Sequence, residues 1–230
     1  DGSVSLPQGS GGSITLGSGL TFNTPEGAMI VFDEDAPLGY RVDAENPFTD
    51  AKPGDWFYDD VMFAYGHGLM TGTDAAGSAS SPDISLTRSM MTTIIYRVTG
   101  SPDASGLSNP FPDVANGIWY ADAVKWAAAN KVVEGYDGRF DPDASITRQD
   151  LAVMLLRFAE YKGLELPEIR TYAAFADDKD VSDYARAAVE ALYKAGIISG
   201  KPGNRLDPKG AATRAEAAAM QRRFLESAGK

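Results

Sequence analysis

Apolar residues recur at helical spacing in three similar stretches, and each stretch begins with the pair Thr-Arg. The pairs are Thr87-Arg88, Thr147-Arg148 and Thr213-Arg214. After Thr147 the stripe consists of Leu151, Met154, Leu155 and Phe158, and the other two stretches carry comparable stripes. A stripe of this width is typical of a helix that packs one face against a core. The pattern therefore predicts three amphipathic helices that start at the threonines.

A second, earlier helix is predicted upstream of each Thr-Arg pair, from the spacing of apolar residues over about 59–65, 120–130 and 182–195. These helices should end near Gly68, Lys131 and Gly196, where a left-handed residue would close the helix. Between the two helices, the segment 135–142 indicates tight turns around a short extended piece. Because one helix pair cannot bury its stripe alone, the units must pack on one another.

The three units stay in phase over most of their length. The recurring positions are Phe48, Phe111 and Phe175; Trp56, Trp119 and Tyr184; and Gly72, Gly135 and Gly200. Self-similarity of this kind is the mark of a repeat protein. The predicted repeats cover 46–104, 109–163 and 173–230, and their connections are rich in Gly, Pro and Ser.

The leader, residues 1–45, differs from the repeats. Its first 19 residues are rich in Gly and Ser, a composition that behaves as flexible coil. Short β-like runs follow at 14–16, 20–22 and 28–32. We interpret them as a hairpin or as the last strands of an upstream domain. The acidic cluster Asp33-Glu34-Asp35 fits a solvated turn better than a cation site.

Composition argues against several classes of function. The chain has 230 residues, 43% of them hydrophobic, and a formal net charge of −11, which argues against nucleic acid as a partner because phosphate binding requires clustered Lys and Arg. It has no cysteine, so disulfides and thiolate chemistry are excluded. No apolar run reaches the roughly 20 residues of a membrane span. A start at Asp1 without a signal sequence suggests a processed or excised fragment.

The helix starts have a structural explanation except for their arginine. Thr213 and Glu216 fit a capping box, Thr147 with Asp150 is a weaker version, and Thr87 has no reciprocal acid. A cation in the first turn opposes the helix dipole. Two explanations stay open at this point. The arginine and the helix N-terminus form an anion site, or the arginine pairs with an acid of its own repeat, such as Asp50, Asp113 or Asp177.

The recurring aromatic and glycine residues also allow two roles. Trp56 and Trp119 can anchor the core, the interpretation we favour, or serve as platforms for sugar rings. Gly72, Gly135 and Gly200 supply left-handed backbone or close approach, and they can also form the floor of a groove.

Catalysis and metal binding find little support in the sequence. His67 is the only histidine and is expected at a helix end or on the surface. No carboxylate pair stands at a recognisable spacing. The Asp-rich loop 137–143 lacks the ligand spacing of an EF-hand. We therefore expect no enzyme activity, no metal site and no cofactor.

The motifs Phe-x-Asp, Trp-Tyr-x-x-Ala-Val, Gly-Tyr-x-Gly-x-Phe-x-Pro and Ile-Thr-Arg-x-Asp closely resemble the S-layer homology domain, over roughly four fifths of the chain. The match is strongest in the second repeat, where 135–142 and 146–148 fit throughout. The third has Tyr184 in place of Trp. The first departs at Ser89-Met90 and at 75–80.

This resemblance implies a mainly α fold, in which three repeats form a pseudo-threefold spindle around a central three-helix bundle behind the β-like leader. It also implies non-covalent anchoring of an exported protein to the bacterial cell envelope, through an anionic and often pyruvylated polysaccharide linked to peptidoglycan. The ligand-binding residues it implies are Arg88, Arg148, Arg214, Trp56, Trp119, Gly72, Gly135 and Gly200. Arg148 and Arg214 are preferred, because the first repeat has lost its acid.

The resemblance places the protein outside the cell, in the bacterial wall or surface layer. One alternative from a different class remains, a structural module that self-associates in a surface layer without binding glycan itself.

Overall fold

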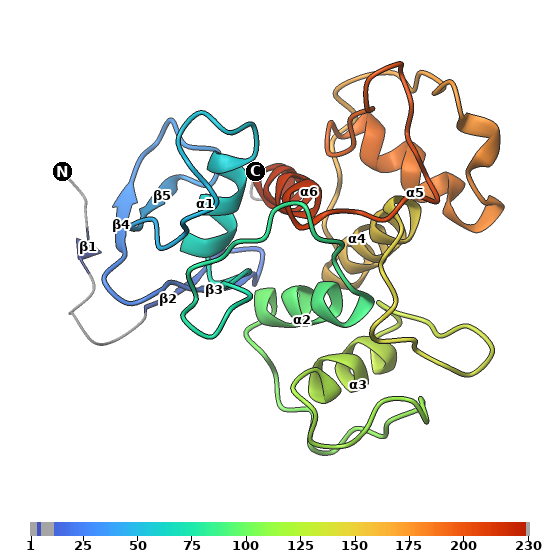
Figure 1. The fold of residues 1–230 in the computed structure, drawn as a ribbon, viewed down its shortest axis with the longest axis horizontal. Helices are drawn as coiled ribbons and strands as arrows, with labels where there is room; N and C mark the ends of the chain where they lie inside the picture. The colour runs from blue at the N-terminus through green and yellow to red at the C-terminus, as the bar shows by residue number, and fades with distance from the viewer. Residues whose placement is uncertain (1–3, 6–11, 229–230) are drawn as a thin grey trace. The chain divides into compact units, whose positions relative to one another are not determined.

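The computed structural model describes residues 4–5 and 12–228 (Figure 1). Its α-helices are α1 (Tyr58–Gly66), α2 (Arg88–Val98), α3 (Ala121–Ala129), α4 (Arg148–Lys162), α5 (Asp183–Lys194) and α6 (Arg214–Ala228), with a 3-10 turn η1 (Asp178–Asp180) before α5. Helices α2, α4 and α6 start directly after the three threonines, and α1, α3 and α5 are the three earlier helices. The prediction of a mainly helical chain with two helices per repeat is confirmed.

The predicted caps form at all three of these helix starts. At α6 the amide of Glu216 donates to Thr213 Oγ1, and the amide of Thr213 donates to the Glu216 carboxylate, which completes a capping box. At α4 the Asp150 amide donates to Thr147 Oγ1. Thr87 accepts from the amide of Met90 without a reciprocal acid. The local sequence thus determines where these helices begin.

The ends of the earlier helices also follow the prediction. Gly68, Lys131 and Gly196 adopt left-handed φ values of 66°, 59° and 76°. Lys131 adopts this conformation although it carries a Cβ, which normally costs free energy. The position in the repeat therefore imposes the conformation whether or not a glycine is present.

The leader forms two small antiparallel sheets. Strand β4 (Met29–Phe32) lies between β1 (Val4–Ser5) and β5 (Tyr40–Asp43), and β2 (Ser13–Thr15) pairs with β3 (Thr21–Asn23). The predicted runs correspond to β2, β3 and β4, whereas β5 was not predicted. The sequence predicts a mobile chain over residues 1–19. Part of this stretch lies outside the described residues, and the described part includes strand β2.

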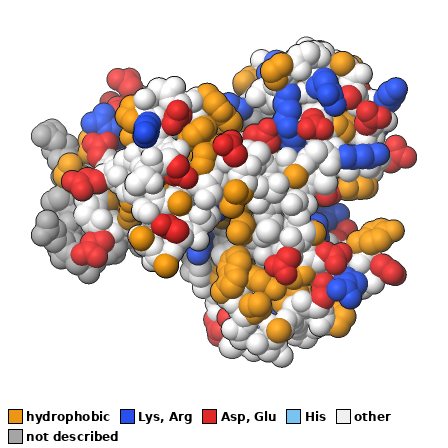
Figure 2. Space-filling view, viewed as in Figure 1, with side chains coloured by type: hydrophobic (Ala, Val, Ile, Leu, Met, Phe, Trp, Pro, Cys, Tyr) orange, Lys and Arg blue, Asp and Glu red, His pale blue; other side chains and the backbone are white. Residues whose placement is uncertain are grey.

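The chain divides into two compact units. Unit 1 comprises residues 1–84, 97–100 and 213–230, and unit 2 comprises residues 85–96 and 101–212. Unit 1 thus contains the leader, α1 and α6, and unit 2 contains α3, α4, α5 and most of α2. Acidic and basic side chains are interspersed over the visible surface (Figure 2).

Within unit 1 the leader packs on the first repeat. Leu20 and Phe22 of the leader are almost fully buried. A Cβ added at Gly68, the residue that closes α1, would lie 1.9 Å from the carbonyl oxygen of Asn23. Such close approach leaves room only for glycine. The leader is therefore a packed part of this unit.

Within unit 2 three backbone hydrogen bonds form a closed ring between the repeats. Leu86 donates to the carbonyl of Ala212, Ala212 donates to Ile146, and Ile146 donates to Leu86, at 2.9, 2.9 and 2.8 Å. Each of these residues directly precedes a capping threonine, and all are fully buried. Buried backbone groups need partners, and in this ring each repeat supplies the partner of another.

Candidate functional site at the repeat junctions

The arginine of each Thr-Arg pair reaches into another repeat and donates to two backbone carbonyls there. The Nε contacts are Arg88 to Phe140, Arg148 to Leu206 and Arg214 to Ser80, at 2.8, 2.7 and 2.9 Å. The Nη2 contacts are Arg88 to Glu134, Arg148 to Ser199 and Arg214 to Thr71, at 3.0, 3.2 and 2.8 Å. The second set of acceptors directly precedes the recurring glycines. The planar guanidinium fits this use, because its donors form a fixed fork.

Each junction lies within one unit. Arg88 bonds to the second repeat and Arg148 to the third, both in unit 2, whereas Arg214 bonds to the first repeat in unit 1. The same two acceptor positions are used each time. The arginine therefore has a structural role, in which it joins one repeat to another, and sequence reasoning did not predict this role.

The recurring aspartates hold the loop that receives the arginine. Asp113 accepts from the amides of Phe140 and Asp141 at 3.0 and 2.8 Å. Asp50 does the same for Ser80 and Ser81, and Asp177 for Leu206 and Asp207. These carboxylates, which the sequence allows as partners for the arginine of their own repeat, thus serve the backbone of the loop.

The electrostatics of these aspartates follow from the same contacts. Burial raises the pKa of Asp113, and the two amides and Arg139 lower it by more, so that the net shift is downward. At the junction in unit 1, burial lowers the pKa of Arg214, and the nearby Asp50 opposes this effect. The fold thus favours the charged form of Asp113, whereas burial works against the charge of Arg214.

The first amides of each helix are also occupied. Arg88 N donates to the carbonyl of Ala144 and Ser89 N to that of Pro142, and the starts of α4 and α6 show the same pattern. The third amide donates to the capping threonine. An anion therefore does not find open N–H groups at these helix starts, and only side chains remain to bind it.

One junction contains an open groove. Arg88, Glu134, Gly135, Tyr136, Phe140 and Arg157 are among the residues that line it, and its volume is about 490 Å³. Arg148 and Arg214 are only 6% and 8% exposed, whereas Arg88 is half-buried. The sequence favours Arg148 and Arg214 as ligand contacts, but the accessibility in the structure favours Arg88.

The recurring glycines permit close approach of the chain. A Cβ at Gly135 would lie 2.5 Å from the carbonyl oxygen of Arg139 and 2.5 Å from Phe111, and Gly72 and Gly200 are similarly crowded by Gly77 and Phe175. None of the three has a left-handed φ. Of the two alternatives left open for their backbone, the structure shows close approach and not left-handed conformation.

The tryptophans do not anchor the core. Trp56 is 66% exposed and Trp119 is 60% exposed, and each ring packs edge-on against the aromatic residue that follows it. The anchoring role favoured from the sequence is therefore wrong. In the second repeat the residue that follows the tryptophan, Tyr120, is buried instead. The exposed indoles are available to a partner.

His67 is a helix-end residue, as expected, but it does not lie on the surface. It follows α1, stacks on Phe63 at 3.9 Å and contacts Phe22 and Tyr40 of the leader. Burial lowers its pKa to about 4. The ring therefore joins the leader to the first repeat as a neutral aromatic group.

Within residues 4–5 and 12–228 no group of three or more His, Cys, Asp or Glu side chains is arranged to hold a metal ion. In the same residues no helix is long and apolar enough to cross a membrane.

Sequence reasoning missed Glu134, Tyr136 and Arg157, although a signal existed for one of them. Arginine recurs nine positions after each Thr-Arg arginine, at Arg97, Arg157 and Arg223. Glu134 and Tyr136 gave no such signal, because the corresponding residues are Thr71 and Thr73 in the first repeat and Ser199 and Lys201 in the third. Only the tertiary structure brings these side chains to one groove.

The family model of the S-layer homology domain matches residues 47–75, 110–152 and 174–218. The chain belongs to this family, and the match falls on the three predicted repeats. The arrangement of arginine forks, aspartate-held loops and crowded glycines is therefore the form that three tandem copies take in this chain.

Three relatives show where such copies occur. The chain is 34% identical to an amylopullulanase of Thermoanaerobacterium thermosulfurigenes over 95% of its own length and 11% of that protein. It is 30% identical to a cellulosome-anchoring protein of Acetivibrio thermocellus, over 65% of the chain and 34% of the relative. It is 26% identical to an S-layer protein of Bacillus thuringiensis subsp. finitimus, over 76% of the chain and 21% of the relative. The chain thus spans about a third or less of these proteins.

Proposed function

We propose that this chain is a non-catalytic module that anchors the protein carrying it to the bacterial cell envelope, by binding an anionic, pyruvylated polysaccharide linked to peptidoglycan. Membership of the S-layer homology family and the names of the anchoring and S-layer relatives support attachment to the cell surface. The observation that carries the site is the groove in unit 2, where Arg88 and Gly135 lie together with a second arginine.

The other predicted contacts belong to the same proposal. Arg148, Arg214, Gly72 and Gly200 occupy the equivalent positions of the other two junctions, and the exposed Trp56 and Trp119 can receive a sugar ring. A pseudo-threefold spindle with α2, α4 and α6 as its central bundle is part of the proposal as well. The identical bonding pattern at the three junctions and the ring of Leu86, Ile146 and Ala212 support it.

Co-sedimentation with sacculi tests the function. Sacculi from Acetivibrio thermocellus and Bacillus thuringiensis would be used intact and after acid extraction of their wall polysaccharide. We expect the protein to sediment with intact sacculi and to stay in solution with extracted ones. Equal sedimentation with both, or with neither, would overturn the proposal. Light scattering of the protein alone would detect self-association, the competing explanation for sedimentation.

Gly135→Ala tests the site. The added Cβ would displace the loop that forms one wall of the groove, because two atoms lie 2.5 Å away. We expect the retained fraction on intact sacculi to fall at least about fivefold, which corresponds to about 1 kcal/mol. Gly106→Ala is the matched control, since no atom lies within 4 Å of its added Cβ. Wild-type retention by Gly135→Ala would exclude this groove.

A further inference from the structure

The arginine of the Thr-Arg pair in this groove already uses two of its five N–H donors to hold the fold together. Arg88 already donates from Nε to Phe140 and from Nη2 to Glu134, and its guanidinium lies 5.0 Å from the centre of the Phe140 ring. A ligand that took over these donors would leave two carbonyls without partners, which is costly where they are shielded from water. A second cation in the same groove would therefore bind the acid of a ligand without competing with these two bonds.

Arg157 supplies such a cation. It lines the same groove from α4, and its Nη2 contacts the carboxylate of Glu134 at 2.7 Å. The side chain of Glu134 is 67% exposed and that of Arg157 is 30% exposed. Exposed pairs of this kind contribute little to stability. A ligand carboxylate can therefore replace Glu134 on Arg157 without disturbing the fold.

The acid of this pair is found at this position in the second repeat alone. The residues that correspond to Glu134 are Thr71 and Ser199, neither of which carries a charge. Arg97, which corresponds to Arg157, donates to the backbone carbonyl of Leu69 at 3.2 Å. In the second repeat this arginine is thus held through a carboxylate that an acidic ligand can mimic.

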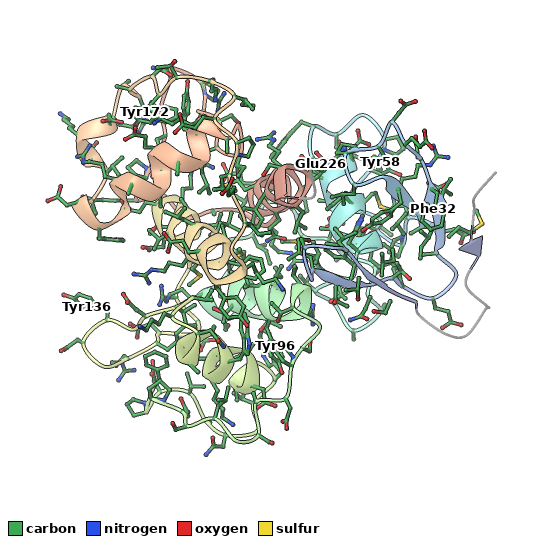
Figure 3. The ribbon with its side chains drawn as sticks, turned by 180° about the vertical axis from the view of Figure 1, so that it is seen from behind. Phe32, Tyr58, Tyr96, Tyr136, Tyr172 and Glu226 are labelled. Atoms are coloured by element: carbon green, nitrogen blue, oxygen red, sulfur yellow. The ribbon has the colours of Figure 1, made fainter. Side chains whose placement is uncertain are left out.

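Tyr136 adds a flat surface at the rim of the groove. It is 82% exposed and lies at the tip of the loop, where it points away from the helices (Figure 3). Its amide bonds to the carbonyl of Arg139, and the two residues between them have positive φ values, as a tight hairpin turn requires. The loop therefore presents an exposed aromatic ring that lines the same groove as Arg157, and a sugar ring can stack on such a surface.

Resting on the proposed function, we propose that Arg157 binds the carboxylate of an acidic saccharide in this groove, that Glu134 occupies Arg157 until the ligand arrives, and that Tyr136 stacks on the sugar ring. Glu134 is thus an internal competitor of the ligand. Removing its charge should strengthen binding, an effect opposite in sign to that expected for a residue that only supports the fold.

Binding of released wall polysaccharide by isothermal titration tests these roles. The polysaccharide of Acetivibrio thermocellus would be used with its carboxylates intact and after their conversion to amides. We expect Arg157→Gln to weaken binding of the intact polymer about tenfold, and Tyr136→Ala to weaken it to a similar extent. Glu134→Gln should tighten it about two- to fivefold. Only Arg157→Gln should abolish the preference for intact over amidated polymer.

Two matched controls separate local from general charge effects. Arg139→Gln removes an exposed arginine of the same loop that does not line the groove, and Glu165→Gln removes an exposed acid after α4. Both should bind like the wild type. If the wild type binds and Arg157→Gln or Glu134→Gln behaves like its control, the roles of Arg157 and Glu134 are wrong and the proposed function stands. If the wild type does not bind either polymer, the proposed function itself fails.

Discussion

The guanidinium of Arg148 donates through Nε to the carbonyl of Leu206 at 2.7 Å, so that a side chain of the second repeat caps the backbone of the third. The contact is buried, and its equivalents recur at Arg88 and Arg214. Such a bond links the position of a helix start to the shape of a loop in another repeat. The stability of the junctions and the shape of the groove therefore depend on the same residues.

Replacing Arg148 should destabilise the protein strongly. Arg148→Ala removes two charge-assisted hydrogen bonds and leaves the carbonyls of Leu206 and Ser199 without these donors. We expect the free energy of unfolding to fall by about 3 kcal/mol. Urea denaturation followed by circular dichroism measures it. Arg148→Lys should recover little, because an ammonium does not provide the fork.

Arg139→Ala is the control for this substitution, since its side chain is exposed and its partners are Asp113 and Asp141. Its effect should stay within about 0.5 kcal/mol. Similar losses in the two variants would show that the contacts across the junction contribute nothing particular.

The aspartates that hold the loops should make stability depend on acid. The folded protein lowers the pKa of three carboxyl groups, those of Asp50, Asp113 and Asp177. Burial raises each pKa, but the hydrogen bonds that each carboxylate accepts from backbone amides lower it by more. A group with a lowered pKa contributes stability that is complete above its unfolded value of about 3.9 and is lost as the pH falls through the folded value. We therefore expect stability to decline below about pH 4.

Asp113→Asn tests this origin of the acid sensitivity. An amide can accept one of the two N–H groups but presents its own NH₂ to the other, so we expect the melting temperature at pH 7 to drop by about 4 °C. The variant should also lose part of the decline below pH 4. A variant that follows the wild-type pH curve would assign the acid sensitivity to other carboxylates.

His67 should produce a separate pH dependence at higher pH. Its pKa falls to about 4 because of burial among Phe22, Tyr40 and Phe63. The unfolded chain binds a proton near pH 6.5, so stability is complete above that value, decreases as the pH falls toward about 4 and levels off below it. Thermal unfolding of the protein between pH 7.5 and 4.5 measures the effect.

His67→Phe removes the titrating group while keeping a planar ring. We expect this variant to be less stable at pH 7.5, because it lacks the Nδ1 contact to the carbonyl of Phe63 at 2.8 Å. Its melting temperature should change far less between pH 7.5 and 4.5. An unchanged slope would mean that the histidine is not the sensor in this range.

Gly68→Ala should release the leader from the first repeat. The added Cβ would lie 1.9 Å from the carbonyl oxygen of Asn23, and φ at this position is left-handed. We expect a loss of about 2 kcal/mol from overpacking and strain together. Limited proteolysis should then cleave within 12–45 faster than in the wild type.

Gly17→Ala is the matched control in the leader, because its added Cβ meets no atom within 4 Å. Its proteolysis rate should equal that of the wild type. Equal rates for both variants would contradict the packing of the leader on α1.

The sequence by itself determined the repeats and the elements within them. Thr87, Thr147 and Thr213 begin helices because a hydroxyl can accept an amide at a helix start, and this requires only neighbouring residues. The helix ends at Gly68, Lys131 and Gly196 are local in the same way. The nearly constant spacing of the recurring residues then predicted the number of repeats and their boundaries.

Tertiary structure decided what the recurring side chains contact. The partners of Arg88, Arg148 and Arg214 are carbonyls of another repeat, which no local pattern specifies. Trp56 and Trp119 are exposed because each indole packs on the aromatic residue that follows it and not in the core. His67 is buried because the leader packs on the end of α1. Arg157 meets Glu134 only because α4 and the loop converge in unit 2. Local hydrogen bonds are encoded within a few residues, whereas these contacts join distant segments that only folding brings together.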